Sequence, residues 1–247
     1  MPVYCVTGSN RGIGLELVRQ ISAQPDTTVL ALTRTLSNDL SGLQGIKTSS
    51  NAKLHILECD IGNAESITNF ASSVTKTLGA GAKIDVLINN SGVQLSATEN
   101  SLSFDPADMT ETFRINTVGP ALVVQRLHAA SALSPSARVV NISSGLGSMS
   151  ATRSGGDEQR HMFSYSVSKA ALNMLTVHQA GNLRTVGGLA DAVVVALDPG
   201  WVQTRMGGDG AQLTPDESVK GILKTVAALK KEDNGAFFEY NGNKREW

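Results

Sequence analysis

An excess of charge of either sign is missing from this 247-residue sequence, in which 21 basic residues stand against 22 acidic ones. Such a chain offers no electrostatic footprint for nucleic acid or for an anionic lipid surface. Long hydrophobic runs are missing too: the longest clean one, Ala192–Leu197, falls far short of the roughly 18 residues that a membrane span needs. We therefore expect neither a nucleic-acid partner nor a membrane partner.

Cysteine and metal-binding patterns are also scarce. The only two cysteines, Cys5 and Cys59, lie in separate apolar segments and form no CxxC pair, which favours two free thiols in a reducing compartment. The first residues lack a basic stretch followed by an apolar core, so we expect no secretory signal and a cytoplasmic location. The four histidines are scattered without an HExxH pattern, and we expect no metal site.

Short apolar segments alternate with longer helical ones along the whole chain. The apolar segments are rich in Val, Ile and Leu and barely alternate with polar residues, which is typical of strands covered on both faces. The predicted strands are Val3–Thr7, Thr28–Thr33, Lys53–Cys59, Ile84–Asn89, Arg138–Ile142, Ala192–Leu197 and Gly235–Glu239, and the predicted helices are Ile13–Ala23, Ala64–Leu78, Pro106–Ala132, Ser164–Leu183 and Pro215–Leu229. The pattern predicts an α/β fold: a single domain, 1–247, with one Rossmann-like, doubly wound parallel sheet of about seven strands and helices on both faces.

Three irregular segments, Val93–Asp105, Gly145–Met162 and Trp201–Leu213, each follow a predicted strand. Loops beyond the carboxyl ends of parallel strands build the ligand crevice of such sheets, so we expect these segments to form the pocket walls. The polar stretch within 151–162 is either a lid over that pocket or an inert surface insertion.

A glycine-rich turn follows the first predicted strand and precedes a helix. Glycines allow a tight turn and a close approach of backbone to a pyrophosphate, while the helix N-terminus supplies N–H donors. The spacing is GxxxGxG rather than the commoner GxGxxG, and a turn without a ligand is the alternative. The candidate cofactor-binding residues of the turn are Gly8, Ser9, Asn10, Arg11, Gly12, Ile13 and Gly14.

The end of the second predicted strand indicates which dinucleotide the turn would bind. A carboxylate there would bond the adenosine ribose hydroxyls, whereas an arginine would accept a 2′-phosphate. The strand ends at Thr33 and Arg34 follows directly, with Arg11 in the glycine turn as a second guanidinium. This favours NADP(H), the alternative being two solvated surface arginines.

Tyr165 and Lys169 stand four residues apart at the start of a predicted helix, so the phenol and the ammonium share one face. A free tyrosine has a pKa of about 10, and a neighbouring cation lowers it, which suits acid–base work. Ser144 ends the predicted strand upstream, where its hydroxyl could bond a substrate carbonyl. Asn116 lies inside a helix, where a bound water near Lys169 would explain it. The alternatives are a surface Tyr–Lys pair and ordinary structural hydrogen bonds.

Together these motifs resemble the short-chain dehydrogenase/reductase family in the family's order and over essentially the whole chain. The narrower resemblance is to sniffer-like or C-factor-like carbonyl reductases, including fungal ketoreductases. The motifs are Thr7-Gly8-x-x-x-Gly12-Ile13-Gly14, Asn89-Asn90-Ser91-Gly92, Asn116, Ser144, Tyr165-x-x-x-Lys169, Pro199–Thr204, and Asn241-Gly242 with the terminal Trp247. Ser91 is a departure, because the family usually has alanine there.

The resemblance implies a role for each matching residue. Tyr165 would donate the proton to the carbonyl oxygen, Lys169 would lower its pKa and bind the nicotinamide ribose, Ser144 would position the carbonyl, and Asn116 would hold a water. The further implied cofactor contacts are Asp60 with Ile61 at the adenine, Asn89, Ser91 and Gly92 along the middle, and Pro199, Gly200, Val202 and Thr204 towards the carboxamide.

The expected reaction is hydride transfer from NADPH to a ketone or aldehyde. Apolar residues on the expected pocket walls, among them Met149, Phe163 and Trp201, favour a small, moderately hydrophobic carbonyl compound. A non-catalytic NADP(H)-sensing or signalling protein of the same fold is one alternative, and an NAD(P)+-dependent alcohol dehydrogenase is another. By resemblance we expect a homodimer or homotetramer formed through the helices Pro106–Ala132 and Ser164–Leu183.

Overall fold

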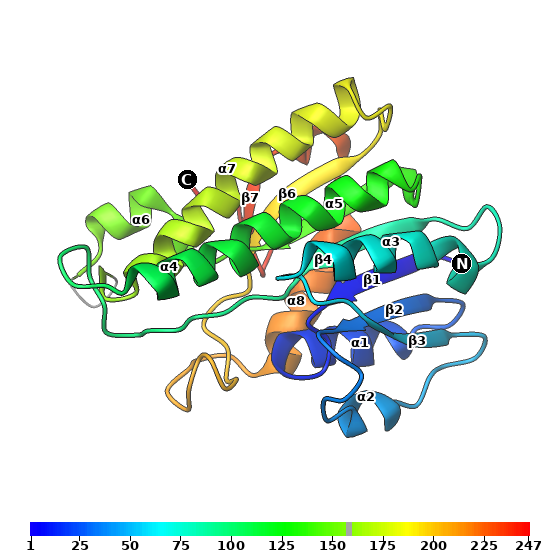
Figure 1. Cartoon of the computed structure of the whole chain (residues 1–247), viewed down its shortest axis with the longest axis horizontal. Coiled ribbons are helices and arrows are strands. Elements are labelled where there is room, and N and C mark those ends of the chain that lie inside the picture. Colours follow the sequence, from blue (N-terminus) through cyan, green and yellow to red (C-terminus); the bar gives the residue numbers. More distant parts are fainter. Residues whose placement is uncertain (157–159) are drawn as a thin grey trace.

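The computed structural model describes residues 1–156 and 160–247 (Figure 1). Within these residues a seven-stranded sheet has the order β3-β2-β1-β4-β5-β6-β7, and every neighbouring pair is parallel. The strands are β1 (Val3–Thr7), β2 (Thr28–Thr33), β3 (Lys53–Glu58), β4 (Ile84–Asn89), β5 (Leu133–Ile142), β6 (Val193–Asp198) and β7 (Phe237–Glu239). The predicted Rossmann-like, doubly wound sheet is confirmed.

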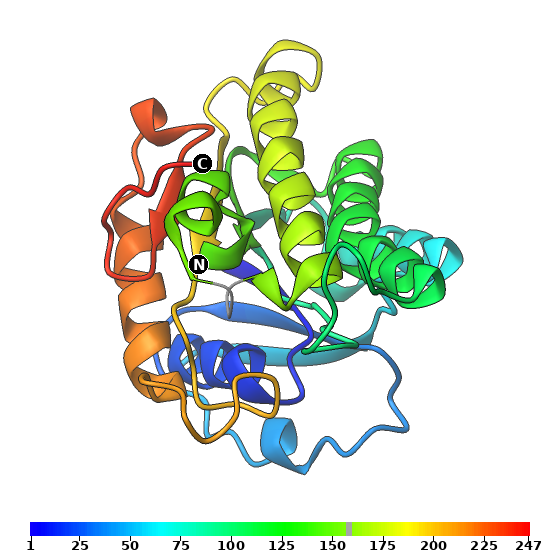
Figure 2. The ribbon, with the colours of Figure 1, turned by 90° about the vertical axis from the view of Figure 1, so that its left-hand side faces the viewer.

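Helices cover both faces of this sheet (Figures 1 and 2). The helices are α1 (Gly12–Ser22), α2 (Ser41–Gln44), α3 (Ala64–Leu78), α4 (Pro106–Phe113), α5 (Gly119–Ala129), α6 (Met149–Ser154), α7 (Phe163–Thr185) and α8 (Pro215–Ala228), with a π-helical turn η1 (Arg114–Val118) and the 3₁₀ turns η2 (Gly145–Gly147) and η4 (Lys231–Asp233). On one face the core is formed against α3, α5 and α7, with Phe70 and Leu127 buried. On the other face α1 and α8 bury Leu17 and Ile222.

The chain changes direction beside β1, because β2 and β3 lie on one side of it and β4 to β7 on the other. In sheets of this kind the ligand crevice opens at that switch point, outside the carboxyl ends of the strands. The carboxyl ends of β1, β4, β5 and β6 carry Thr7, Asn89, Ile142 and Asp198. The sheet order therefore brings the glycine turn and the segments after β4, β5 and β6 to one edge.

The prediction of one continuous helix over Pro106–Ala132 is wrong, because the helix is interrupted and ends earlier, at Ala129. The structure divides it into α4, η1 and α5, and the chain passes into β5 already at Leu133. Pro120 has no N–H to donate to the Asn116 carbonyl, which interrupts the α-helical ladder at this point. The predicted start of β5 at Arg138 was therefore too late.

The segment after β5 is more ordered than its sequence indicates. Gly145–Met162 was expected to be irregular, but it contains η2 and α6. Ser144 and Ser148 begin these two elements, each accepting a bond from a backbone N–H in the following turn. Of the proposed lid, residues 157–159 lie outside the described residues.

Two further expectations concern the whole chain. Both Cys5 and Cys59 are free and buried, as predicted. None of the helices in the described part of the chain has the length and apolar character required to span a membrane.

Candidate active site

The glycine-rich turn between β1 and α1 allows a ligand to approach the backbone. Gly8 and Gly12 have φ angles of 67° and 54°, in the left-handed region that side-chain-bearing residues rarely adopt. A Cβ on Gly14 would come within 2.1 Å of the Gly8 carbonyl oxygen, so only glycine fits there. The turn leads into the N-terminus of α1, where N–H groups and the helix dipole attract phosphate.

The end of β4 is fastened to this turn by Asn90, a residue that the sequence did not single out for the site. The Asn90 side chain donates to the Thr7 carbonyl oxygen over 2.9 Å, and the Asn90 and Ser91 amides both donate to the Thr7 hydroxyl. A Cβ on Gly8 would lie only 2.7 Å from the Ser91 hydroxyl oxygen. Ser91 therefore lies directly over the turn, and Asn90 holds the two strand ends together.

Three arginines gather beside the glycine turn. Burial lowers the pKa of Arg11, and the nearby charges of Arg205 and Arg34 lower it further. Within 1–156 and 160–247, no carboxylate forms an ion pair with any of the three. Arg205 was not predicted as a site residue, because it lies far from the turn in the sequence. This cluster offers an unneutralised cationic surface to an anionic ligand.

The loop Trp201–Leu213 brings Arg205 to the cluster. Its two ends pair through Val202 and Leu213, and the Trp201 indole donates to the Gly207 carbonyl oxygen over 2.8 Å. The methyl carbon of Thr204 lies 3.4 Å from the position of a Cβ on Gly12. The loop is thus internally bonded and touches the glycine turn.

Tyr165 and Lys169 lie in the first turns of α7, with the Lys169 Nζ 5.6 Å from the centre of the Tyr165 ring. Lys169 is 3% exposed and donates to the Ile142 carbonyl oxygen over 2.7 Å. The two groups share one face of the helix, as their spacing predicts.

The expected lowering of the Tyr165 pKa by Lys169 is wrong for this structure. Burial raises the pKa of Tyr165 to about 12; hydrogen bonding with Ser144 opposes this, and the charge of Asp198 adds to it. Burial lowers the pKa of Lys169 to about 8, against the opposing effect of Asp198. Desolvation is the largest effect at both groups, although Lys169 is buried and Tyr165 is only partly buried. At neutral pH the phenol therefore holds its proton.

The two serines at the end of β5 differ in their surroundings. Ser143 is buried, and its hydroxyl donates to the Asn173 side-chain oxygen over 2.6 Å. Ser144 instead begins η2, accepts a bond from the Leu146 amide over 3.2 Å, and lies close enough to Tyr165 to influence its pKa. The structure therefore brings Ser144, rather than Ser143, to the phenol.

Asn116 is completely buried in η1, and its side chain bonds to the segment after β4 and to α7. Its oxygen accepts from the Val93 amide over 2.8 Å, and its nitrogen donates to the Val93 carbonyl and the Ser168 hydroxyl. A Cβ on Gly92 would lie 3.3 Å from the Asn116 oxygen and 3.6 Å from the Lys169 nitrogen. The side chain thus braces the segment after β4 next to Lys169.

Of the other predicted cofactor contacts, Asp60 lies after the end of β3, whereas Ile61 and Asn89 are buried inside the protein. Asp60 follows β3 and binds the Gly62 amide, and Ile61 is buried against Gly119. Asn89 is 2% exposed, and its amide donates to the Asn141 oxygen of β5 over 2.8 Å. Asn89 therefore ties two strands together, and its contact with the cofactor stays a prediction.

Two buried carboxylates near Tyr165 were missed by the sequence analysis. Glu99, after β4, accepts a bond from the Ser164 amide over 2.8 Å and so caps the helix that carries Tyr165. Asp198, at the end of β6, pairs with Arg245 at 3.0 Å. No local pattern distinguishes either acid, because each finds its partner through long-range folding.

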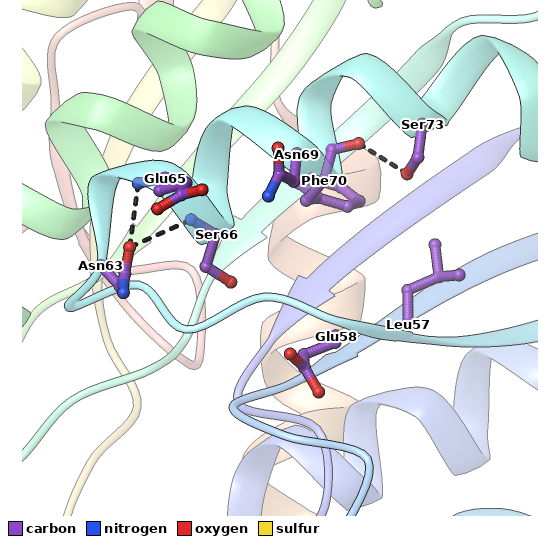
Figure 3. A pocket seen from close by; sticks show the side chains of 8 residues that line it. All are labelled: Leu57, Glu58, Asn63, Glu65, Ser66, Asn69, Phe70 and Ser73. Carbon is purple, nitrogen blue, oxygen red and sulfur yellow. Dashed lines mark hydrogen bonds between the residues drawn. The ribbon is translucent and has the colours of Figure 1, made fainter.

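A hollow of about 360 Å³ lies elsewhere, between β3 and α3 (Figure 3). It is lined by Leu57, Glu58, Asn63, Glu65, Ser66, Asn69, Phe70 and Ser73. None of the candidate catalytic residues borders it. Asn63 is occupied there in capping α3, accepting bonds from the amides of Glu65 and Ser66.

Known proteins resemble this chain along most of its length. The family model described as short chain dehydrogenase matches residues 2–212. The C-signal protein of Myxococcus xanthus is 40% identical over 165 residues, which cover 66% of this chain and 93% of that protein. An oxidoreductase of Schizosaccharomyces pombe is 33% identical over 266 residues, which cover 97% of this chain and 96% of that protein.

Solved structures agree with these relatives. The NADPH-bound carbonyl reductase from chicken fatty liver superposes with a TM-score of 0.85 at 33% identity, covering 100% of both chains. The carbonyl reductase Sniffer of D. melanogaster superposes with a TM-score of 0.82 at 28% identity, again over 100% of both chains.

Proposed function

Because the chain belongs to the short-chain dehydrogenase family, we propose that it is an NADPH-dependent reductase of ketones or aldehydes. The family resemblance inferred from the motifs is confirmed by the match over residues 2–212. The observation that carries the proposed activity is the meeting of Ser144, Tyr165 and Lys169 at the carboxyl edge of the sheet. A hydroxyl, a protonated phenol and an ammonium are the groups that a developing alkoxide requires.

The residues around the glycine turn fit NADP(H) in shape and charge. Gly8 and Gly12 have left-handed φ angles and a Cβ on Gly14 would collide with the Gly8 carbonyl oxygen, so the backbone turns tightly into the N-terminus of α1. Arg11, Arg34 and Arg205 would meet the 2′-phosphate, since a guanidinium matches phosphate geometry. The NADPH-bound chicken carbonyl reductase supports this assignment.

The cofactor, when bound, supplies the hydride, and the chain supplies position and the proton. We propose that the Tyr165 phenol donates its proton to the carbonyl oxygen while the Ser144 hydroxyl donates a hydrogen bond to that oxygen. Lys169, with a pKa of about 8, is mostly charged at neutral pH and stabilises the negative charge that develops nearby. With its pKa raised to about 12, the phenol is protonated at neutral pH, which is the state that protonation of a carbonyl oxygen requires.

Exposed apolar side chains on the three loops after β4, β5 and β6 support a moderately hydrophobic substrate. Met149 is 67% exposed and Trp201 55% exposed, although both side chains are large and apolar. The others on these loops are Leu95, Leu102, Phe104 and Met206. Exposed apolar side chains on loops at this edge of the sheet are typical of a small-molecule pocket.

A related observation favours a homodimer or homotetramer. Met174 and Val177 on α7 and Val118 on η1 are between 44% and 58% exposed. These apolar side chains lie on the helices through which the resemblance implies association. The cytoplasmic location and the extent of the single domain, 1–247, likewise stay proposals.

The decisive measurement is NADPH consumption by the purified chain with benzaldehyde, acetophenone, cyclohexanone and dihydroxyacetone. We expect turnover of the aromatic carbonyls and a preference for NADPH over NADH of about tenfold or more, because only NADPH carries the phosphate that the arginines meet. Tight NADPH binding without turnover of any carbonyl would favour the sensing alternative. A preference for NADH would contradict the role of the arginine cluster.

A further inference from the structure

An ion pair between a buried carboxylate and a partly buried arginine lies beside the candidate catalytic groups. Arg245, the third residue from the end of the sequence, is 3.0 Å from the carboxylate of Asp198 and 2.9 Å from that of Glu239. The Asp198 side chain is 10% exposed and that of Arg245 is 25% exposed. A charge pair so little exposed needs an accurate fit to offset its desolvation.

The C-terminal segment is built to hold Arg245 at this place. Its amide donates to the Phe237 carbonyl oxygen over 2.9 Å, and Phe238 pairs with Lys244 in an antiparallel bridge. The guanidinium lies 6.0 Å from the centre of the Phe237 ring, and the Trp247 ring stacks on the same phenylalanine at 5.3 Å. The last residues therefore fold back along β7 and are fixed on both sides of Arg245.

Asp198 connects this segment to the candidate catalytic serine. Its carboxylate accepts a hydrogen bond from the Gly200 amide over 3.0 Å, and the amide of Gly145, which directly follows Ser144, lowers its pKa. A Cβ on Gly145 would lie 3.0 Å from the Asp198 oxygen and 3.4 Å from the Arg245 guanidinium carbon, so the three groups are in close contact. A displacement of Asp198 would therefore reach the Ser144 backbone.

The C-terminal residues also hold the segment that follows Ser144. The Ser148 hydroxyl donates to the Glu246 carbonyl oxygen over 2.8 Å, and the Ser150 amide donates to the Trp247 carbonyl oxygen over 3.0 Å. In Figure 2 the C-terminus lies next to α6. Both ends of the turn that begins at Ser144 are thus anchored to the last three residues or to their ion-pair partner.

The charge of Asp198 also acts on the reacting groups. Its carboxylate raises the pKa of both Lys169 and Tyr165. At Lys169 this opposes the effect of burial, which lowers the pKa, and at Tyr165 it adds to the effect of burial, which raises the pKa. Arg245 lowers the pKa of Asp198 and Glu239 raises it, while burial raises it most. The charge of Asp198 thus acts on Lys169, and Arg245 is the ion-pair partner of that carboxylate.

We propose that Arg245 is a positioning residue for the reaction: through Asp198 it fixes the Ser144 turn and holds a compensated negative charge beside Tyr165 and Lys169. The expected effect of Arg245 on the reaction rate rests on the proposed function, whereas its expected effect on the Lys169 pKa does not. The C-terminal segment is then a working part of the active site.

The electrostatic consequence is measured without any substrate, by NMR titration of full-length protein labelled at lysine Cε, with the Lys169 signal assigned from Lys169→Met. Asp198→Asn removes the negative charge, so the Lys169 pKa falls. Arg245→Met leaves the carboxylate less compensated, so the Lys169 pKa rises. We expect the two changes to have opposite signs and a size of about half a pH unit or more.

The double variant Asp198→Asn/Arg245→Met keeps the test usable where Arg245→Met alone does not fold, because it removes the buried Asp198 charge together with its partner and leaves only the partly exposed Glu239 unpaired. If Arg245 acts through Asp198, the double variant has the lowered Lys169 pKa of Asp198→Asn alone. A rise in the double variant, equal shifts of one sign in the two single variants, or no shift at all would overturn the proposal.

The kinetic consequence is measured with NADPH and benzaldehyde over a range of pH. Arg245→Met lowers kcat about tenfold, because the Ser144 hydroxyl is displaced from the carbonyl oxygen. The KM for NADPH stays within about twofold, and Arg245→Lys recovers most of the rate. As a matched control, Lys231→Met breaks the exposed ion pair with Asp191 at 2.9 Å and leaves kcat unchanged. Equal loss in both variants would contradict a role of Arg245 in positioning.

The two measurements separate the failure of this inference from that of the proposed function. A wild-type chain without carbonyl reduction refutes the proposed function, while the opposite shifts of the Lys169 pKa still test the Arg245–Asp198 connection. If the wild-type chain is active but Arg245→Met changes neither kcat nor the Lys169 pKa, the inference is refuted and the proposed function is not.

Discussion

The proposed phosphate site and the proposed catalytic site lie at the same edge of the sheet, but their charged groups differ in exposure to solvent. At the phosphate end, Arg11, Arg34 and Arg205 are exposed, and no carboxylate in the described part of the chain forms an ion pair with them. At the catalytic end, Lys169 is buried, and its ammonium donates to the Ile142 carbonyl oxygen. The exposed arginines are placed to attract an anionic ligand from solution. At the catalytic end, burial changes the pKa values of the chain's own groups.

This difference determines which perturbation each end responds to. Exposed charges are screened by salt over a Debye length of about 10 Å at moderate ionic strength, whereas buried ones are screened much less. Burial changes the pKa of a group, but an exposed arginine stays charged at every accessible pH. Binding of the cofactor should therefore depend on salt, and the chemical step should depend on pH.

Replacing the phenol hydroxyl is the largest disruption that the catalytic end allows. We expect Tyr165→Phe to lower kcat by about 100-fold or more, because the alkoxide loses its proton donor. NADPH binding, followed by its fluorescence, should hardly change, since the arginines are untouched. Tyr4→Phe, a tyrosine at the opposite end of β1, is the matched control. Nearly full carbonyl reduction by Tyr165→Phe would refute the assignment of the acid.

Replacing the buried ammonium tests whether burial governs this end. The pKa of Lys169 falls from 10.5 to about 8 on folding, so below pH 8 the charged group is buried at full cost. We expect Lys169→Met to stabilise the protein at pH 7 by about 2 kcal/mol in urea unfolding, after the lost bond to Ile142 is counted, while abolishing most activity.

The pH dependence of that gain has a definite sign. Between pH 8 and 10.5 the unfolded chain binds more protons at this lysine than the folded one, so the wild type gains stability relative to the variant as pH rises. The advantage of Lys169→Met should therefore shrink over this window. An advantage that is constant with pH would show that packing, rather than the buried charge, causes it.

The smallest effect is expected at the phosphate end. Arg34→Ala and Arg205→Ala should each raise the KM for NADPH by about tenfold at low salt, with kcat nearly unchanged, and by less at high salt. NADH kinetics should respond little, because that cofactor has no 2′-phosphate. Arg126→Ala on α5 is the control. An equal loss for NADPH and NADH would assign the arginines to the diphosphate rather than to the 2′-phosphate.

Local sequence was sufficient for most of the framework. The ranges predicted for β1, β2, α3 and β4 agree with the structure residue for residue. Runs of Val, Ile and Leu between turn signals determine buried strands, and caps such as Asp105 before Pro106 determine where helices begin. The pattern fails at η1, since one proline decides between an α-helix and a π-turn there.

For the candidate site, too, some features could be predicted from the sequence and others were decided by the tertiary structure. Spacing alone places Lys169 one turn from Tyr165 on α7, and strand order places Ser144 and the glycine turn at one edge. The sign of the Tyr165 pKa change, the arrival of Arg205 and the pairing of Asp198 with Arg245 were decided by the tertiary structure. Motifs record which groups are neighbours along an element, but desolvation and charge pairing depend on what the rest of the chain packs around them.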